Sequence, residues 1–156
     1  MGTRSITRVI ETWNDEKTSK LKKQILVCMY RQMDGYPSGM GSDLAEFLNS
    51  GKLVNGISLA ETERVFNGMG CLAAQMVAHF KDGAGGYYLY PTNTKDACQD
   101  YEYEIIQHEG EELKLKVIEV GYINNKGKYC EGKKTLYFGS AKGFESWLSV
   151  KETIEG

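Results

Sequence analysis

A glycine-rich turn between an apolar run and a helical pattern constrains the fold of this chain more than any other segment. Three glycines and one proline lie within the seven residues 35–41, between the apolar run 25–29 and the helical pattern 44–48. Glycine and proline impose backbone paths that other residues follow only under strain. A strand, a tight turn and a helix start are therefore predicted here. In such an arrangement, backbone N–H groups are free to bind an anion.

Hydrophobic patterning predicts a single α+β domain in which a mainly antiparallel sheet packs against two or three helices. Alternating side chains predict a first strand at 6–13. The segment 24–33 is apolar on both faces, which is typical of a strand near the centre of a sheet. Ser58 and Glu61 have the spacing of a capping box, so a helix is expected from Ser58 to about Lys81.

The second half of the chain is predicted to be mostly β. Strands are expected at 87–90, 101–105, 113–117 and 136–138, followed by a helix at 144–150. With a three-residue turn that ends at a left-handed Gly110, Tyr103 faces Leu115 in the central hairpin. In the same register, Glu102 and Glu104 face lysines on the outer surface of the sheet.

The composition excludes some classes of protein. The 156 residues are 41% hydrophobic and 26% charged, which predicts one globular domain. The net charge of −2 offers no basic excess for binding nucleic acid, which is not an expected partner. No apolar run approaches the ~20 residues of a membrane span and no signal-peptide pattern is present, so a cytoplasmic location without membrane contact is expected. The four cysteines are widely spaced, and no metal or cofactor is predicted.

The glycine-rich turn is also the predicted binding site for a small anionic ligand. Arg31 ends the second strand, and with Arg4 or Arg8 of the first strand it would offer guanidinium donors to a phosphate or carboxylate. Backbone N–H groups of residues 39–43 would add the positive end of a helix. An aromatic residue in the turn would stack on a base or another ring. The predicted contacts are Arg4, Arg31, Asp34, Tyr36, Gly39, Gly41, Ser42 and Asp43.

A purely structural interpretation of the same residues is a tight strand-to-helix turn. Ser42 or Asp43 would then cap the helix, and Arg31 would form an ion pair with Asp34. The turn has neither the G-K-[ST] of a Walker loop nor the G-x-G-x-x-G of a dinucleotide-binding loop. Its residues therefore do not decide between the two interpretations.

The start of the chain and the glycine-rich turn carry two distinctive motifs. Residues 1–4 read M-G-T-R, residues 32–41 read Q-M-D-G-Y-P-S-G-M-G, and Phe47-Leu48 ends the helical pattern that follows. These motifs resemble a family of small uncharacterised proteins from phages, bacteria and some fungi, whose members share M-G-T-R, Q-x-D-G-Y-P-S-G-x-G and a terminal F-L. The match covers about the first third of the chain, and Met33 stands where an aromatic residue is common. Because the family has no established activity, the resemblance implies a functional loop without naming its function.

The leading hypothesis is a protein that binds a small anionic ligand without converting it. A nucleotide or a nucleotide-derived signal is the expected ligand. The resemblance to phage proteins implies sequestration of a defence signal as one role for such binding. Whether the chain forms a homo-oligomer, and whether it has enzymatic activity, are questions that the sequence leaves open.

Two other functions also remain open. Thr3 follows a glycine and starts a strand, an outline similar to N-terminal-nucleophile hydrolases, in which the amine of the nucleophile is the base. Lys22 or Lys23 would then lower the pKa of that amine. Alternatively, the tyrosine-rich strand 87–90 would form a surface that binds another protein.

Overall fold

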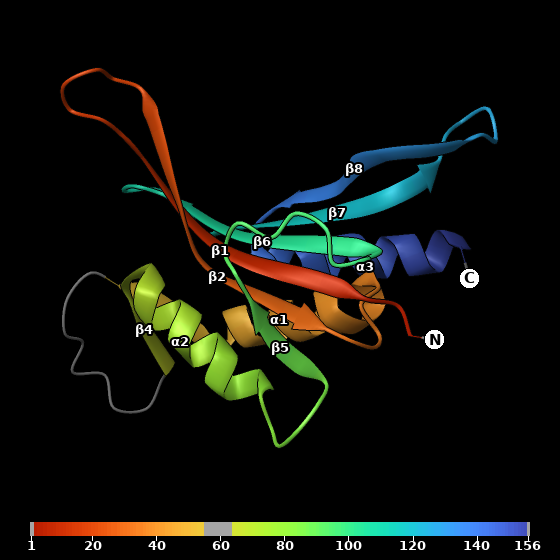
Figure 1. The fold of residues 1–156 in the computed structure, drawn as a ribbon, viewed down its shortest axis with the longest axis horizontal. Coiled ribbons are helices and arrows are strands. Elements are labelled where there is room, and N and C mark those ends of the chain that lie inside the picture. Colours follow the sequence, from red (N-terminus) through yellow and green to blue (C-terminus); the bar gives the residue numbers. More distant parts are fainter. Residues whose placement is uncertain (1, 55–63, 156) are drawn as a thin grey trace.

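The computed structural model describes residues 2–54 and 64–155, which form two sheets and three α-helices (Figure 1). The large sheet consists of β1 (Ser5–Asn14), β2 (Leu21–Arg31), β5 (Tyr87–Tyr90), β6 (Tyr101–His108), β7 (Lys114–Ile123) and β8 (Tyr129–Gly139). The small sheet pairs β3 (Gly51–Val54) with β4 (Arg64–Asn67). The helices are α1 (Ser42–Asn49), α2 (Gly68–Phe80) and α3 (Ala141–Glu155), and a π-helix, Pro37–Gly41, leads into α1. The predicted α+β class is thereby confirmed.

The strand order of the large sheet is β5-β2-β1-β6-β7-β8. Neighbouring strands are antiparallel except for β1 and β6, which are parallel. The prediction that 24–33 lies at the centre of the sheet is wrong, because β2 is second from the edge. Its apolar outer face has another cause: Cys28 and Tyr30 pack with Ile6 in a small second core beside Tyr90 and Ala97.

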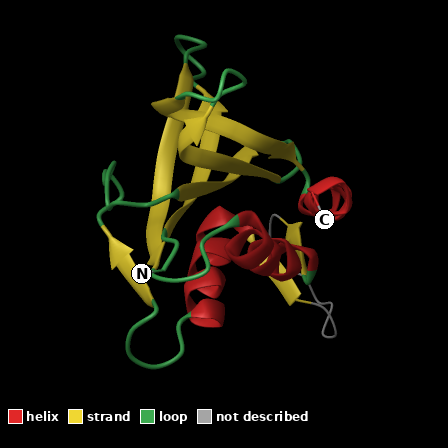
Figure 2. Cartoon of the chain, turned by 90° about the vertical axis from the view of Figure 1, so that its right-hand side faces the viewer, coloured by secondary structure: helices red, strands yellow, loops and turns green. Residues whose placement is uncertain are grey.

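The helices lie on one side of the large sheet and enclose the main core (Figure 2). Every second side chain of a strand points toward the helices, because successive residues of a strand point to opposite faces of the sheet. Core residues from the sheet include Val9, Met29, Tyr103, Ile105, Leu115 and Val117, and those from the helices include Leu44, Phe47, Leu72, Met76 and Phe144. No helix in the described part of the chain is long and apolar enough to cross a bilayer.

The β6–β7 hairpin forms where it was predicted, but its register differs by two residues. Tyr103 faces Val117 and not Leu115, because the connection between the strands is longer than three residues. Gly110 does adopt the left-handed conformation, with φ of 79°. The predicted solvated charge pairs are correspondingly wrong at Glu102, which faces Ile118 and is 1% exposed.

The segment predicted as one helix from Ser58 to Lys81 contains a strand and a shorter helix. Ser58 and the rest of its capping box lie outside the described residues. Arg64–Asn67 pairs in parallel with β3, and the helix begins only at Gly68. Gly68 has a φ of 84°, a conformation that separates the strand from the helix and that glycine adopts without strain.

Candidate functional site

The glycine-rich turn folds as a π-helix that continues directly into α1. The N–H groups of Gly39 and Met40 donate at 2.9 Å to the carbonyls of Tyr36 and Asp34. The N–H of Ser42 donates back into the π-helix, and no side-chain cap is present at the start of α1. The expectation of free N–H groups is therefore wrong at Gly39, Met40 and Ser42, and the expected side-chain cap is also absent. These three N–H groups are not available to an anion.

Arg31 holds the turn together from the end of β2. Its Nε donates to the Met33 carbonyl at 2.6 Å, and its Nη1 lies 2.7 Å from the carboxylate of Asp43. The guanidinium also lies 5.6 Å from the ring centroid of Tyr87. The Arg31 side chain is 14% exposed, so it is largely committed to these partners. The structural interpretation predicted an ion pair for Arg31 but named the wrong partner, because Asp43 and not Asp34 binds the guanidinium.

The two motifs of the sequence, M-G-T-R and the glycine-rich block, contact one another. The N–H of Gly35 donates to the Thr3 carbonyl at 2.9 Å. A Cβ atom on Gly35 would lie 2.8 Å from the carbonyl carbon of Arg4, and one on Gly2 would lie 2.8 Å from the carbonyl oxygen of Gln32. These separations are too short for a side chain, so glycine is required at both contacts. The motifs therefore have a structural reason to occur together.

The remaining predicted contacts are distributed between the interior and the surface. Gly41 is buried against the ring of Phe144, from which a Cβ atom would be 2.7 Å away. A Cβ atom on Gly39 would overlap the Asp34 carbonyl oxygen. The Tyr36 hydroxyl donates to Asp34 at 3.0 Å, and this hydrogen bond raises the pKa of the tyrosine. Only Tyr36 and Asp34 of this group are exposed.

Arg8 does not join Arg31, because it lies on the outer face of the sheet in a buried charge cluster. The Glu102 carboxylate accepts from Arg8 at 2.6 Å, from Lys133 at 2.7 Å and from Gln99 at 3.0 Å. Burial alone raises the pKa of Glu102, but its hydrogen bonds to Lys133, Arg8 and Gln99 outweigh burial and leave that pKa below its usual value. Arg8 also donates to the Thr94 carbonyl at 2.8 Å, so the cluster fastens the loop 91–100 to the sheet.

The structure contradicts the role that the hydrolase hypothesis gave to Lys22 or Lys23. Lys22 and Lys23 pair with Trp13 and Thr12, at the end of the β1–β2 hairpin opposite Thr3. Nine or more residues separate Thr3 from those positions along β1, which is about 30 Å at ~3.3 Å per residue. Neither lysine can lower the pKa of an amine on Thr3.

The tyrosine-rich strand β5 forms one edge of the large sheet. It pairs with β2 only over Cys28–Arg31, and Tyr88 and Leu89 are exposed. A small apolar hollow of about 200 Å³ lies between this edge and α2. The structure thus places the predicted interaction surface at an accessible sheet edge.

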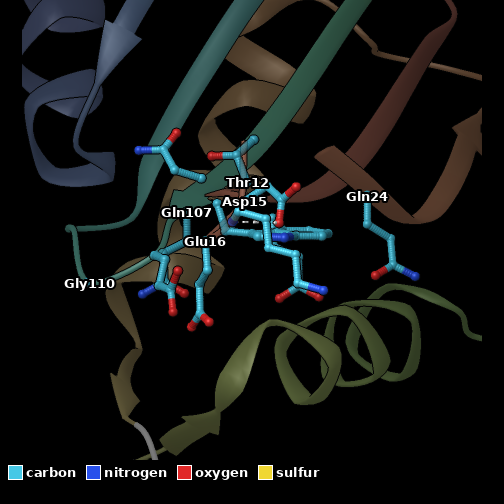
Figure 3. A pocket seen from close by; sticks show the side chains of 11 residues that line it. Thr12, Asp15, Glu16, Gln24, Gln107 and Gly110 are labelled. Carbon is cyan, nitrogen blue, oxygen red and sulfur yellow. Dashed lines mark hydrogen bonds between the residues drawn. The ribbon is translucent and has the colours of Figure 1, made fainter. Parts of the chain in front are cut away.

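A first large groove lies between the tip of the β1–β2 hairpin and the β6–β7 turn (Figure 3). It encloses about 580 Å³, and Thr12 in its wall shares a 2.9 Å hydrogen bond with Nδ1 of His108. The lining carboxylates are those of Glu11, Asp15, Glu16 and Glu109, with Lys17 as the lining cation. An excess of negative charge repels anions, so this groove is unsuitable for the predicted ligand class.

A second groove, here called the α3 groove, lies between the glycine-rich turn, the β7–β8 hairpin and α3. It encloses about 480 Å³ and is lined by Pro37, Ser38, Tyr101, Glu119, Ile123, Lys134, Leu136, Trp147, Leu148, Lys151 and Glu152. The Lys151 ammonium lies 5.0 Å from the Trp147 ring centroid. The Lys134 ammonium lies 5.7 Å from the ring centroid of Tyr122. Two cations, Lys134 and Lys151, and two aromatic side chains, Tyr101 and Trp147, thus lie in one groove beside the glycine-rich turn.

The α3 groove is not predictable from the sequence, because its residues are distant along the chain. The turn contributes Ser38, whereas Lys134 and Lys151 follow about a hundred residues later. One local signal was available: Trp147 and Lys151 are four residues apart, which places them on the same face of a helix. Nothing in the sequence predicted that this face would meet the glycine-rich turn.

No three His, Cys, Asp or Glu side chains among residues 2–54 and 64–155 are arranged to hold a metal ion. The resemblance based on the two motifs stays a prediction, and the function has to be inferred from the geometry of the site. Comparison of the chain with protein-family models, with curated proteins and with solved structures finds no match.

Proposed function

We propose that this protein binds a small anionic ligand of the nucleotide class in the α3 groove, without converting it chemically. The observation that carries the proposal is the presence of Lys134 and Lys151 in a groove of about 480 Å³ beside the glycine-rich turn. Small-molecule sites commonly enclose roughly 300–1,000 Å³, so the space suits a ligand of this size. The location differs from the one predicted from sequence, but the ligand class is the same.

The two lysines are available for a ligand. Neither ammonium lies within 4.0 Å of a carboxylate oxygen among the side chains that the structure describes. Each instead lies over an aromatic ring, an arrangement that holds a cation without neutralising it. An anionic group between Lys134 and Lys151 would gain both charges at once.

The aromatic residues and the carboxylates of the groove restrict the ligand further. Tyr101 and Trp147 contribute aromatic side chains to the groove wall, and the Lys151 ammonium lies over the Trp147 ring. Glu119 and Glu152 also line the groove, so a ligand gains more when it brings hydrogen-bond donors for these carboxylates as well as an anionic group for the two lysines. A ligand with an anionic group at one end and hydrogen-bond donors on a ring at the other satisfies both kinds of residue, and a nucleotide has this composition.

The proposal is tested by titrating the protein with a panel of nucleoside monophosphates and triphosphates, with pyrophosphate as the probe that lacks a ring. Isothermal titration calorimetry measures affinity, and Trp147 fluorescence in a Trp13→Phe background reports occupancy of the groove. We expect at least one nucleotide to bind and to change the fluorescence, and pyrophosphate to bind more weakly.

Variants locate the site. Lys134→Gln and Lys151→Gln should each weaken binding about tenfold or more, since a charge-assisted contact contributes roughly 1.5–3 kcal/mol. Lys142→Gln is the matched control, because Lys142 lies on the same helix and is exposed but does not line the groove. The proposal fails if no nucleotide binds at millimolar concentration, or if Lys142→Gln weakens binding as much as Lys151→Gln does.

A further inference from the structure

The lysines of this chain are concentrated on the β7–β8 hairpin, residues 114–139. This segment contains six lysines and two glutamates and therefore has a net charge of +4. Because the whole chain carries −2, the remaining residues carry −6. The hairpin is a cationic element on an otherwise acidic protein. The small net charge of the chain conceals this division, and it was the net charge that argued against nucleic acid.

The tip of the hairpin presents two of these lysines on a well-defined turn. It projects from the body of the protein at the upper right of Figure 1. The Asn124 side-chain oxygen accepts from the N–H groups of Lys126 at 2.9 Å and Lys128 at 3.0 Å, and Gly127 has a φ of 77°. Among the described side chains, neither tip ammonium forms an ion pair.

Large exposed aromatic side chains accompany the lysines. Tyr129 is 66% exposed and Phe138 is 59% exposed, both on β8. Tyr122 lies beneath the Lys134 ammonium. Proteins that bind single strands combine cations that follow the phosphates with aromatic rings on which bases stack. The β7–β8 hairpin has both components.

We propose that the β7–β8 hairpin binds single-stranded nucleic acid. Lysines on an edge strand also discourage pairing between sheet edges, but that role does not require exposed aromatic residues. A lipid surface would require apolar residues at the tip, where this hairpin has the polar residues 124–128. A duplex offers phosphates but no unstacked bases for Tyr129 and Phe138. The inference is independent of the α3 groove, because its partner is a polymer and its main cations lie outside that groove.

Fluorescence anisotropy with labelled twelve-nucleotide oligo-dT and oligo-U tests the proposal on the full chain, with a duplex of the same length for comparison. For four phosphate contacts, the logarithm of the affinity should fall with that of the salt concentration with a slope of about −2.8. Affinity should then drop about 50-fold between roughly 50 and 200 mM salt. The duplex should bind more weakly than either single strand.

Charge reversal at the tip distinguishes binding at this hairpin from non-specific electrostatic attraction to the whole protein. Lys126→Glu/Lys128→Glu should lower the affinity at least tenfold and reduce the salt slope by about 1.4. Lys20→Glu/Lys22→Glu makes the same charge change near the tip of the β1–β2 hairpin and should leave affinity within about twofold. Tyr129→Ser should weaken binding without changing the slope, because it removes stacking and no charge. Circular dichroism checks that each variant is folded.

Three results would overturn the proposal. The first is no anisotropy change at roughly 50 mM salt, where phosphate contacts are strongest. The second is equal affinity for the single strand and the duplex. The third is an equal loss of affinity in the Lys20/Lys22 and Lys126/Lys128 variants. If the nucleic-acid proposal fails, the nucleotide titration still tests the α3 groove, since that experiment uses mononucleotides and different variants.

Discussion

Replacement of Glu102 by glutamine should destabilise the protein more than any change on its surface. Glu102 is 1% exposed, and its carboxylate neutralises the guanidinium of Arg8, which is 7% exposed and lies 2.6 Å away. Glu102→Gln keeps the side-chain volume but leaves Arg8 buried without its counter-charge. Loss of one partner of a buried ion pair costs about 3–5 kcal/mol, because the remaining charge stays out of water.

Urea denaturation followed by tryptophan fluorescence measures this effect. With a denaturant dependence of about 2 kcal/mol per molar urea, the unfolding midpoint should fall by about 1.5–2.5 M. Lys133→Gln is the matched control, since Lys133 binds the same carboxylate but is 52% exposed and can turn to water. That variant should cost less than about 1 kcal/mol.

A double variant separates charge burial from loss of contacts. Arg8→Met/Glu102→Met removes both charges and should recover most of the stability lost in Glu102→Gln, since apolar pairs commonly replace buried ion pairs without loss. A midpoint for Glu102→Gln within about 0.5 M of the wild type would refute the reasoning, because it would mean that Arg8 does not depend on its partner.

Other predictions follow from single contacts. The pKa of Glu102 is lower in the folded than in the unfolded protein, so its contribution to stability is complete above about pH 4.3 and disappears as the pH falls through the folded-state pKa. The urea midpoints of the wild type and Glu102→Gln should therefore converge below about pH 4. Gly70→Ala should raise the melting temperature by the equivalent of about 0.5–1 kcal/mol, because Gly70 is exposed within α2 and its added Cβ would meet no atom within 4 Å. Tyr103→Phe removes a 2.6 Å hydrogen bond to the Gly35 carbonyl and should cost about 1–3 kcal/mol in thermal or urea unfolding.

Local patterns predicted the positions of the strands better than the register in which they pair. Alternation identified β1, β6 and β7, because a period of two marks which face of a strand is buried. The same period leaves a shift of two residues undetected, so Tyr103 was assigned to Leu115 and not to Val117. The left-handed Gly110 was predicted correctly, but a glycine does not reveal how many residues the turn contains.

The candidate site was harder to predict because its contacts are long-range. The glycine-rich turn was identified as a special backbone path, but the sequence did not show that its N–H groups bond internally. Arg8 and Glu102 are 94 positions apart in the sequence. Ser38 lies in the first third of the chain but lines the same groove as residues of α3 near its C-terminus. Such pairs depend on sheet order, which one sequence without structure does not supply.

The parallel pairing of β1 with β6 has a consequence for synthesis of the protein on the ribosome. β1 can pair with β2 as soon as both strands have emerged from the ribosome. Its other edge has no partner until β6, Tyr101–His108, has been translated. The 88 residues between Thr12 and Tyr101 take roughly 4–18 s to translate at ~5–20 residues per second. During that time the nascent chain exposes an unpaired strand edge that contains Ile6, Val9 and Ile10. A nascent-chain chaperone therefore has a defined segment to protect, and a ribosome stalled before β6 would release an aggregation-prone hairpin.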